Sequence, residues 1–228
     1  MSEREVVERG AGERAGSERD RGERRTGGRG SGGAWARLGR DFARLRRVKG
    51  RGCWAALADA LLLDAGFQAL VAHRFAHALR RAGVPVLPAV LRRWAIGACA
   101  VDLLPAADLG GGCIIAHGVG LVVGGETVIG EDCTLLHGVT LGEVRFEESA
   151  CPRLGDRVTV GAGAAVLGGV SVGDDATIGA GAVVLADVPP GARAAGVPAR
   201  VVGWNPGHDR TVAADPDRRS DAAWEDDR

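Results

Sequence analysis

The sequence has no excess of charge of either sign, because 29 Lys and Arg residues balance 29 Asp and Glu residues over 228 positions. A protein that attracts nucleic acid or a membrane surface through its overall field needs such an excess, so neither partner is expected. Long apolar runs are also missing. The runs near residues 54–63 and 84–104 are interrupted or bounded by Asp or Arg and are too short or too charged to span a bilayer. The first residues lack the apolar segment of a secretory signal, so none is expected.

Cysteine is scarce, with five residues at irregular spacing. An odd, irregular set argues against a disulfide framework and favours reduced thiols in the cytoplasm. No P-loop or dinucleotide-binding fingerprint is present, since the G-A-G-A at 161–164 belongs to a longer repeat. His73 and His77 share a helix face at i, i+4, but a third ligand and the glutamate of H-E-x-x-H are lacking. We expect them to pack, and we expect no metal site.

The composition divides the chain into four parts. Residues 1–34 are mostly Glu, Arg, Gly and Ser and are expected to be a disordered charged segment, as is the tail 205–228. Residues 35–104 are expected to form a small helical domain, because the stretch 54–84 carries apolar residues at three- and four-residue spacing and ends on two arginines and Gly83. A second apolar stretch, 90–104, resumes after Pro85 and Pro88.

Residues 105–204 are dominated by a six-residue repeat of aliphatic side chains. The repeat is followed at positions 109, 115 and 121, then after a two-residue offset at 129, 135 and 141, and after the excursion 143–150 at 154, 160, 166, 172, 178 and 184. This period fits neither a helix nor a half-exposed strand. It is typical of a left-handed parallel β-helix, in which small residues form the corners and about three hexapeptides close a coil of about 18 residues. The predicted fold is therefore mainly β, with four to five coils preceded by helices.

The repeat places two histidines in matching surroundings. His117 follows Ile115 by two residues and His137 follows Leu135 by two residues, and Ile115 and Leu135 are one full coil apart in the predicted register. The two imidazoles are therefore expected at the same corner of successive coils, about 4.8 Å apart in rung spacing. Cys113 and Cys133 should stack likewise as packed thiols.

The segments VDLLPAADLGGGCIIAHGVGLVVGGETVIG, LLHGVTLG and GVPARVVG, within residues 65–203, resemble the serine acetyltransferases, a family of hexapeptide acyltransferases. The resemblance implies transfer of acetyl from acetyl-CoA to a hydroxyl, with His117 as the general base and Asp102 as the carboxylate that orients it. The chemistry agrees, because an alcohol attacks a thioester only as a base removes its proton, and a carboxylate on the second ring nitrogen stabilises the imidazolium.

The resemblance also implies positions for the two substrates. The acceptor would meet His137, Ala116, Ala150 and Cys151, where the family usually carries an Asp before the histidine and an Arg-His pair before the proline. The pantetheine arm of CoA would lie against the small residues Gly142, Ala162 and Ala180. Ala116, Ala150 and Cys151 replace charged or imidazole groups. The side chains with which the family binds an amino acid's ammonium and carboxylate are therefore altered here. Cys151 has no evident base, so a covalent role is not expected.

Two alternatives to an L-serine acetyltransferase of cysteine biosynthesis remain open at this stage. One is O-acetylation of a sugar or secondary-metabolite hydroxyl, and the other is an idle β-helix scaffold. A homotrimer is expected, since flat-sided β-helices of this class build active sites between protomers. The chain ends W-E-D-D-R without the terminal isoleucine by which such enzymes dock into cysteine synthase, so that complex is not expected.

Overall fold

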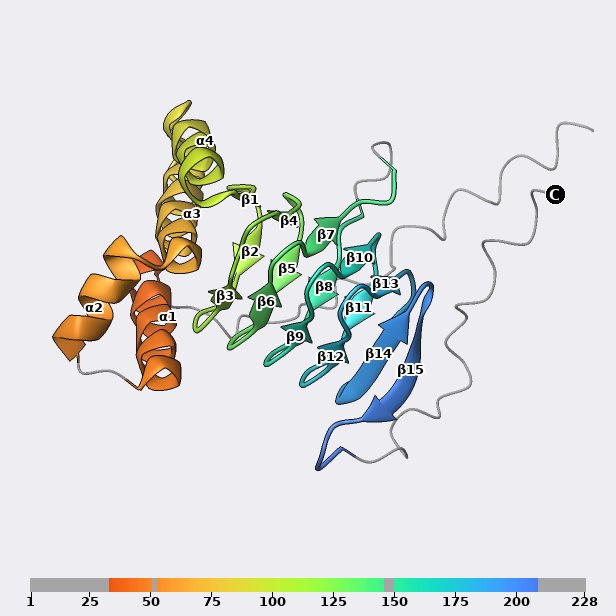
Figure 1. The fold of residues 1–228 in the computed structure, drawn as a ribbon. Coiled ribbons are helices and arrows are strands. Elements are labelled where there is room, and N and C mark those ends of the chain that lie inside the picture. Colours follow the sequence, from red (N-terminus) through yellow and green to blue (C-terminus); the bar gives the residue numbers. More distant parts are fainter. Residues whose placement is uncertain (1–32, 51–52, 146–149, 209–228) are drawn as a thin grey trace, which may run out of the picture. The chain divides into compact units, whose positions relative to one another are not determined.

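A computed structural model describes residues 33–50, 53–145 and 150–208, and within them four helices precede a stack of short strands (Figure 1). The helices are α1 Ala34–Lys49, α2 Cys53–Leu62, α3 Ala65–Arg81 and α4 Leu87–Cys99. None of these helices is long and apolar enough to cross a membrane.

The apolar stretch 54–84 is divided into two helices at Asp64. The carboxylate of Asp64 caps α3, where its Oδ1 accepts a hydrogen bond from the backbone N–H of Phe67 at 2.8 Å. α3 ends on Arg80 and Arg81 as the sequence predicts, and Gly83 follows with φ +75°. The second apolar stretch is helical only to Cys99, because β1 begins at Val101. The β-helix thus starts ahead of the 105 expected from the repeat.

Apart from the last strand, β15, the strands stack in parallel into three flat sheets, with one strand of each sheet in a coil, which confirms the predicted β-helix. The first sheet contains β1 Val101–Leu103, β4 Leu121–Val123, β7 Thr140–Gly142, β10 Ala165–Leu167 and β13 Val183–Val184. The second contains β2 Asp108–Leu109, β5 Val128–Ile129, β8 Arg153–Leu154 and β11 Ser171–Val172. The third contains β3 Ile114–Ala116, β6 Thr134–Leu136, β9 Thr159–Val160, β12 Thr177–Ile178, β14 Ala192–Gly196 and β15 Ala199–Trp204.

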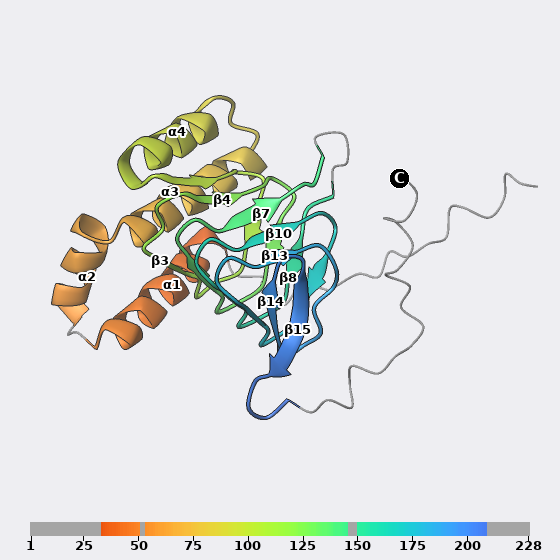
Figure 2. The ribbon, with the colours of Figure 1, turned by 45° about the vertical axis from the view of Figure 1, so that its right-hand side comes forward.

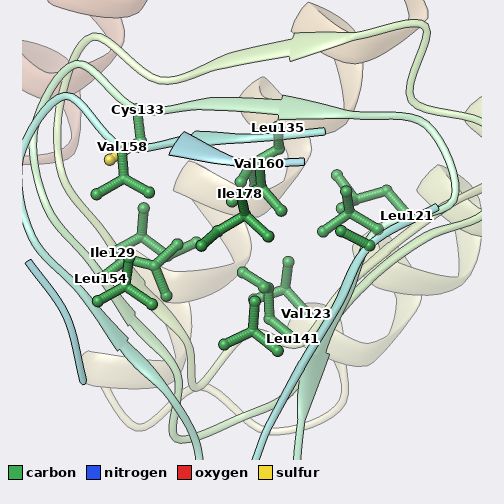
Figure 3. Close-up of a cluster of buried hydrophobic side chains, with 14 of the residues drawn as sticks. Leu121, Val123, Ile129, Cys133, Leu135, Leu141, Leu154, Val158, Val160 and Ile178 are labelled. Carbon is green, nitrogen blue, oxygen red and sulfur yellow. The ribbon is translucent and has the colours of Figure 1, made fainter. Parts of the chain in front are cut away.

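The aliphatic side chains of the repeat fill the interior of the coils. Figure 3 shows them meeting from the three sheets, and Leu121, Leu135 and Leu141 are each 0% exposed. Burying one such side chain stabilises the fold by about 1.5–3 kcal/mol. Val160 pairs with Ile178, 18 residues further on, so a coil after the excursion contains three hexapeptides as predicted.

The position of the two-residue offset differs from the sequence prediction. Val123, and not Leu121, pairs with Leu141, while Ala116 pairs with Leu136. The extra residues therefore lie between β3 and β4, and the repeat shifts there instead of after Leu121. Two buried positions in β4, Leu121 and Val123, make both registers compatible with the apolar pattern, so the pattern by itself placed the offset wrongly.

The helices lie against the first coils, as Figure 2 shows for α1 and α3 beside β3. One face of α1 carries arginines that reach backbone carbonyls and carboxylates of these coils. Arg44 Nη1 donates to Gly112 O at 2.6 Å and to Cys133 O at 2.8 Å, and Arg40 pairs with Glu131 at 2.6 Å. At the far end β15 pairs antiparallel with β14 and covers its edge.

Candidate active site

His117 lies at the corner between β3 and β4, where the chain turns from the third sheet to the first. Its φ is +54°, a left-handed conformation that is uncommon outside glycine, and its carbonyl accepts a hydrogen bond from Val119 N at 2.7 Å. The residue is exposed. Val122 follows Ala116 by six positions, whereas their partners Thr140 and Leu136 are four positions apart, so this corner contains the two extra residues.

Glycine is required beside His117 by close packing. A Cβ on Gly118 would lie 2.5 Å from Ile115 Cγ2 and 2.8 Å from Val101 Cγ2, both of which belong to the core. Gly120 has φ +77° and donates its N–H to Ala100 O at 2.9 Å, which joins the end of the corner to the chain just before β1. The longer corner thus keeps a defined backbone path around His117.

His137 occupies the same corner in the next coil. Ala116 pairs with Leu136 in a parallel register, so the residues that follow, His117 and His137, are stacked as the sequence predicts. The next residue, Gly138, donates its N–H to Val119 O at 2.9 Å. Like His117, His137 is exposed.

Two of the expected cofactor-binding residues, Ala162 and Ala180, continue this corner. The N–H of Gly163 donates to His137 O at 2.9 Å, and the N–H of Gly181 donates to Ala162 O at 2.8 Å. With the pairing of β6 to β9 and β9 to β12, these bonds place His137, Ala162 and Ala180 at one corner of successive coils. We call the row formed by His117 and these three residues the histidine corner. It presents two imidazoles followed by two methyl groups.

Gly142, Ala150 and Cys151 lie at a different corner, between β7 and β8. Gly142 ends β7 with open space at its Cβ position, and Ala150 is exposed. Cys151 is buried, with Sγ 4.0 Å from Glu143 Oε1. Within one chain the structure does not bring these three residues to His117. Ala116, by contrast, ends β3 directly beside it.

Asp102 has a partner that the sequence analysis did not identify. In β1 it pairs with Val122 of β4, and its carboxylate accepts hydrogen bonds from Arg92 Nε at 2.6 Å and Arg92 Nη2 at 2.7 Å. These bonds raise the pKa of the Arg92 guanidinium. Among the described residues no hydrogen bond joins Asp102 to His117. Arg92 lies on α4, and no local sequence signal shows that this helix folds back onto β1.

His73 and His77 lie on α3 beside the loop between β1 and β2. Their ring centroids are 5.9 Å apart, and His77 Nδ1 lies 3.1 Å from Pro105 O. Burial, with Arg74 and His77 nearby, lowers the pKa of His73 to about 3. In the part of the chain that the structure describes, no group of three or more His, Cys, Asp or Glu side chains gathers as a metal site would need.

Comparison with known proteins agrees with this architecture. The family model described as "Bacterial transferase hexapeptide (six repeats)" matches residues 152–186, which places the β-helix among the hexapeptide-repeat transferases. The serine acetyltransferase of Helicobacter pylori J99 is 45% identical over 145 residues, which is 63% of this chain and 85% of that protein. The serine acetyltransferase of Synechococcus elongatus is 43% identical, over 63% of this chain and 59% of its own length.

Solved structures show the same relationship. The crystal structure of serine acetyltransferase in complex with coenzyme A from Brucella abortus S19 superposes with a TM-score of 0.70 at 36% identity, over 75% of this chain and 68% of that one. Soybean serine acetyltransferase superposes with a TM-score of 0.70 at 38% identity, over 75% of this chain and 69% of its own. The chain belongs to the serine acetyltransferase family.

Proposed function

We propose that this protein is an acetyl-CoA-dependent O-acetyltransferase that acetylates the hydroxyl of L-serine, the step that leads to cysteine. The histidine corner carries this proposal. It stacks His117 and His137 above the small residues Ala162 and Ala180, so a thioester lying along the corner would end beside an imidazole. The similarity to a serine acetyltransferase that binds coenzyme A supports acetyl-CoA as the donor.

His117 acts as the general base in the proposed reaction. Its neutral imidazole removes the proton from the acceptor hydroxyl as the oxygen attacks the thioester carbonyl. The tetrahedral intermediate then collapses, the carbon–sulfur bond breaks, and the imidazolium returns the proton to the thiolate of CoA. Asp102 is assigned the stabilisation of the imidazolium. Its strand, β1, pairs with β4, the strand that follows His117. Such base catalysis is worth about 10²–10⁴-fold in rate.

Serine is proposed as the acceptor from the names of the relatives, and the altered pocket supports a second candidate. Ala116, Ala150 and Cys151 offer no charge to an ammonium or carboxylate. Cys151 is buried, and its Sγ lies 4.0 Å from Glu143 Oε1. A small alcohol or sugar hydroxyl is the alternative acceptor.

The active unit is proposed to be a homotrimer in the cytoplasm. Gly142, Ala150 and Cys151 lie at another corner from His117, so a neighbouring subunit would be needed to bring these substrate positions to the base. The four cysteines whose side chains the structure describes are free thiols, which supports a reducing compartment.

The test measures CoA release from acetyl-CoA with a panel of L-serine, other small alcohols and sugars. Release with serine supports the first acceptor, and release only with another alcohol replaces serine while keeping the transferase. His117→Ala is expected to lower kcat about a hundredfold or more with the accepted substrate. His208→Ala, at the far end of the β-helix, serves as the matched control. Unchanged turnover of His117→Ala would remove His117 as the base, and absence of acetyl-CoA binding by calorimetry would leave only a scaffold.

A further inference from the structure

Arg92 and Asp102 form a two-bond ion pair between α4 and β1. The two elements are joined by Ala100, whose left-handed backbone (φ +53°) ends the helix and reverses the chain so that α4 lies against β1. Both nitrogens that face the carboxylate, Nε and Nη2, donate at 2.6–2.7 Å, one to each oxygen. This fork fixes the plane of the carboxylate as well as its position.

The pair leaves Asp102 able to bind a second donor. A carboxylate offers about four lone-pair sites, and the Arg92 fork uses one on each oxygen. The side chains of Arg92 and Asp102 are 37% and 24% exposed, so the remaining sites are not sealed by the core. Asp102 can therefore hold Arg92 and accept from an imidazole N–H together.

The turn between β3 and β4 that contains His117, which we call the His117 corner, is bonded to the same segment that Arg92 holds. Asp102 pairs with Val122 of β4, and the N–H of Gly120 donates to Ala100 O. The corner thus ends on the residue that turns α4 into β1, two positions before Asp102. A shift of Asp102 therefore directly changes where its carboxylate lies relative to the His117 corner.

We propose that Arg92 is a positioning residue for acetyl transfer, which holds the Asp102 carboxylate in the plane from which it orients His117. The proposal rests on the proposed function, in which Asp102 and His117 act together. Arg92 also shares the negative charge of Asp102, so it weakens the stabilisation that this carboxylate gives to a protonated imidazole. Around Asp102, α4 contributes Arg92 and β4 contributes the apolar Val122, and the described residues contain no other ion pair to this carboxylate.

The first experiment compares Arg92→Gln and Arg92→Lys with Arg93→Gln, a change at the adjacent, exposed arginine. Arg92→Gln is expected to lower kcat about tenfold to a hundredfold through misplacement of the carboxylate, with the KM for acetyl-CoA nearly unchanged. The acid limb of the pH–kcat/KM profile should move to higher pH. Arg92→Lys restores the charge without the fork and should recover part of kcat. Arg93→Gln should match the wild type.

The second experiment shows whether Arg92 acts through Asp102. In an Asp102→Asn background, Arg92→Gln is expected to cause little further loss of kcat, because the carboxylate it holds is already gone. A wild-type kcat and pH profile in Arg92→Gln would overturn the proposal. So would wild-type behaviour of Arg92→Lys when neither single variant has fully lost activity. Additive losses of kcat in the double variant would also overturn it.

A readout without turnover separates this proposal from the proposed function. The His117 ring is titrated by NMR in the wild type and in Arg92→Gln, with the signal assigned from His117→Ala. An upward shift of the His117 titration in Arg92→Gln supports the link through Asp102 even if no acceptor is turned over. An unchanged titration overturns it. Retained turnover in His117→Ala instead removes His117 as the base, and absence of acetyl-CoA binding overturns the proposed function. Thermal midpoints of all variants identify losses caused by unfolding.

Discussion

Arg74 of α3 and Asp41 of α1 form a buried ion pair at the junction between the helices and the first coil. Arg74 Nε lies 3.1 Å from Asp41 Oδ2 and Nη2 lies 3.2 Å from Oδ1, and the two side chains are 4% and 0% exposed. Asp41 Oδ1 also accepts from Cys113 N at 2.9 Å, while Arg74 donates to the carbonyls of Leu109 and Gly110. The ion pair thereby joins α1 and α3 to β2 and the loop that follows β2 in one hydrogen-bond network.

Removing the charge of Asp41 is predicted to destabilise the protein strongly. Asp41→Asn leaves the Arg74 guanidinium buried without a counter-charge, which typically costs about 3–5 kcal/mol. The control is the exposed pair Arg157–Asp175, with the same two-bond geometry and side chains 53% and 28% exposed. Arg157→Gln should cost about 1 kcal/mol or less because solvent screens this pair. Urea unfolding measures both, and equal losses would contradict the assigned role of burial.

His73 is predicted to make the fold sensitive to mild acid. Its pKa is lowered to about 3 in the folded protein by burial, whereas an exposed histidine titrates near 6.5. Below pH 6.5 the unfolded chain therefore binds a proton that the folded chain does not, and stability falls as the pH falls toward 3. Between pH 7 and pH 5 the wild type should lose about 2 kcal/mol more free energy of unfolding than His73→Phe.

The measurement for His73 is urea unfolding of both proteins at several pH values. Carboxylates also titrate in this range, so the difference between the two proteins is the informative quantity. Parallel pH profiles would contradict the prediction, as would a larger acid loss in His73→Phe.

The thiol of Cys133 is predicted to be inert in the folded protein. Burial raises its pKa to about 12, and burial likewise raises the pKa of Cys113 in the coil before it. At pH 8 the thiolate fraction of Cys133 is then about three orders of magnitude below that of an ordinary cysteine. Alkylation with iodoacetamide, mapped by peptide mass spectrometry, should label both residues only after denaturation. Rapid labelling of the folded protein would show that the core opens at these coils.

Ala180 is predicted to contribute to acetyl-CoA binding through its small size, a prediction that depends on the proposed function. Ala180→Leu places a larger side chain on the histidine corner and should raise the KM for acetyl-CoA about tenfold, equivalent to about 1.4 kcal/mol of binding. Ala186→Leu is the matched control, since Ala186 is also exposed but lies between β13 and β14 at another corner. Initial rates over a range of acetyl-CoA concentrations compare the variants. Equal KM values would place the CoA path elsewhere.

The site was partly predictable because one of its features is periodic. The stacking of His117 and His137 follows from counting hexapeptides, and the register Ala116 to Leu136 confirms it. The position of the offset was not predictable, because Leu121 and Val123 are both apolar and both buried, and only strand pairing distinguishes them. The partner of Asp102 was not predictable either, since it depends on where α4 lies after the turn at Ala100.

The sequence by itself determined the coil, its three sheets and most of the aliphatic residues that face its interior, because each hexapeptide carries its own local pattern of one inward aliphatic and small corner residues. Only the tertiary structure decided that the His117 corner is the longer one, that Arg92 holds Asp102 and that Arg74 and Asp41 join the helices to the first coil. These features depend on contacts between residues far apart in the chain or on either side of a turn. A local period contains no information about them.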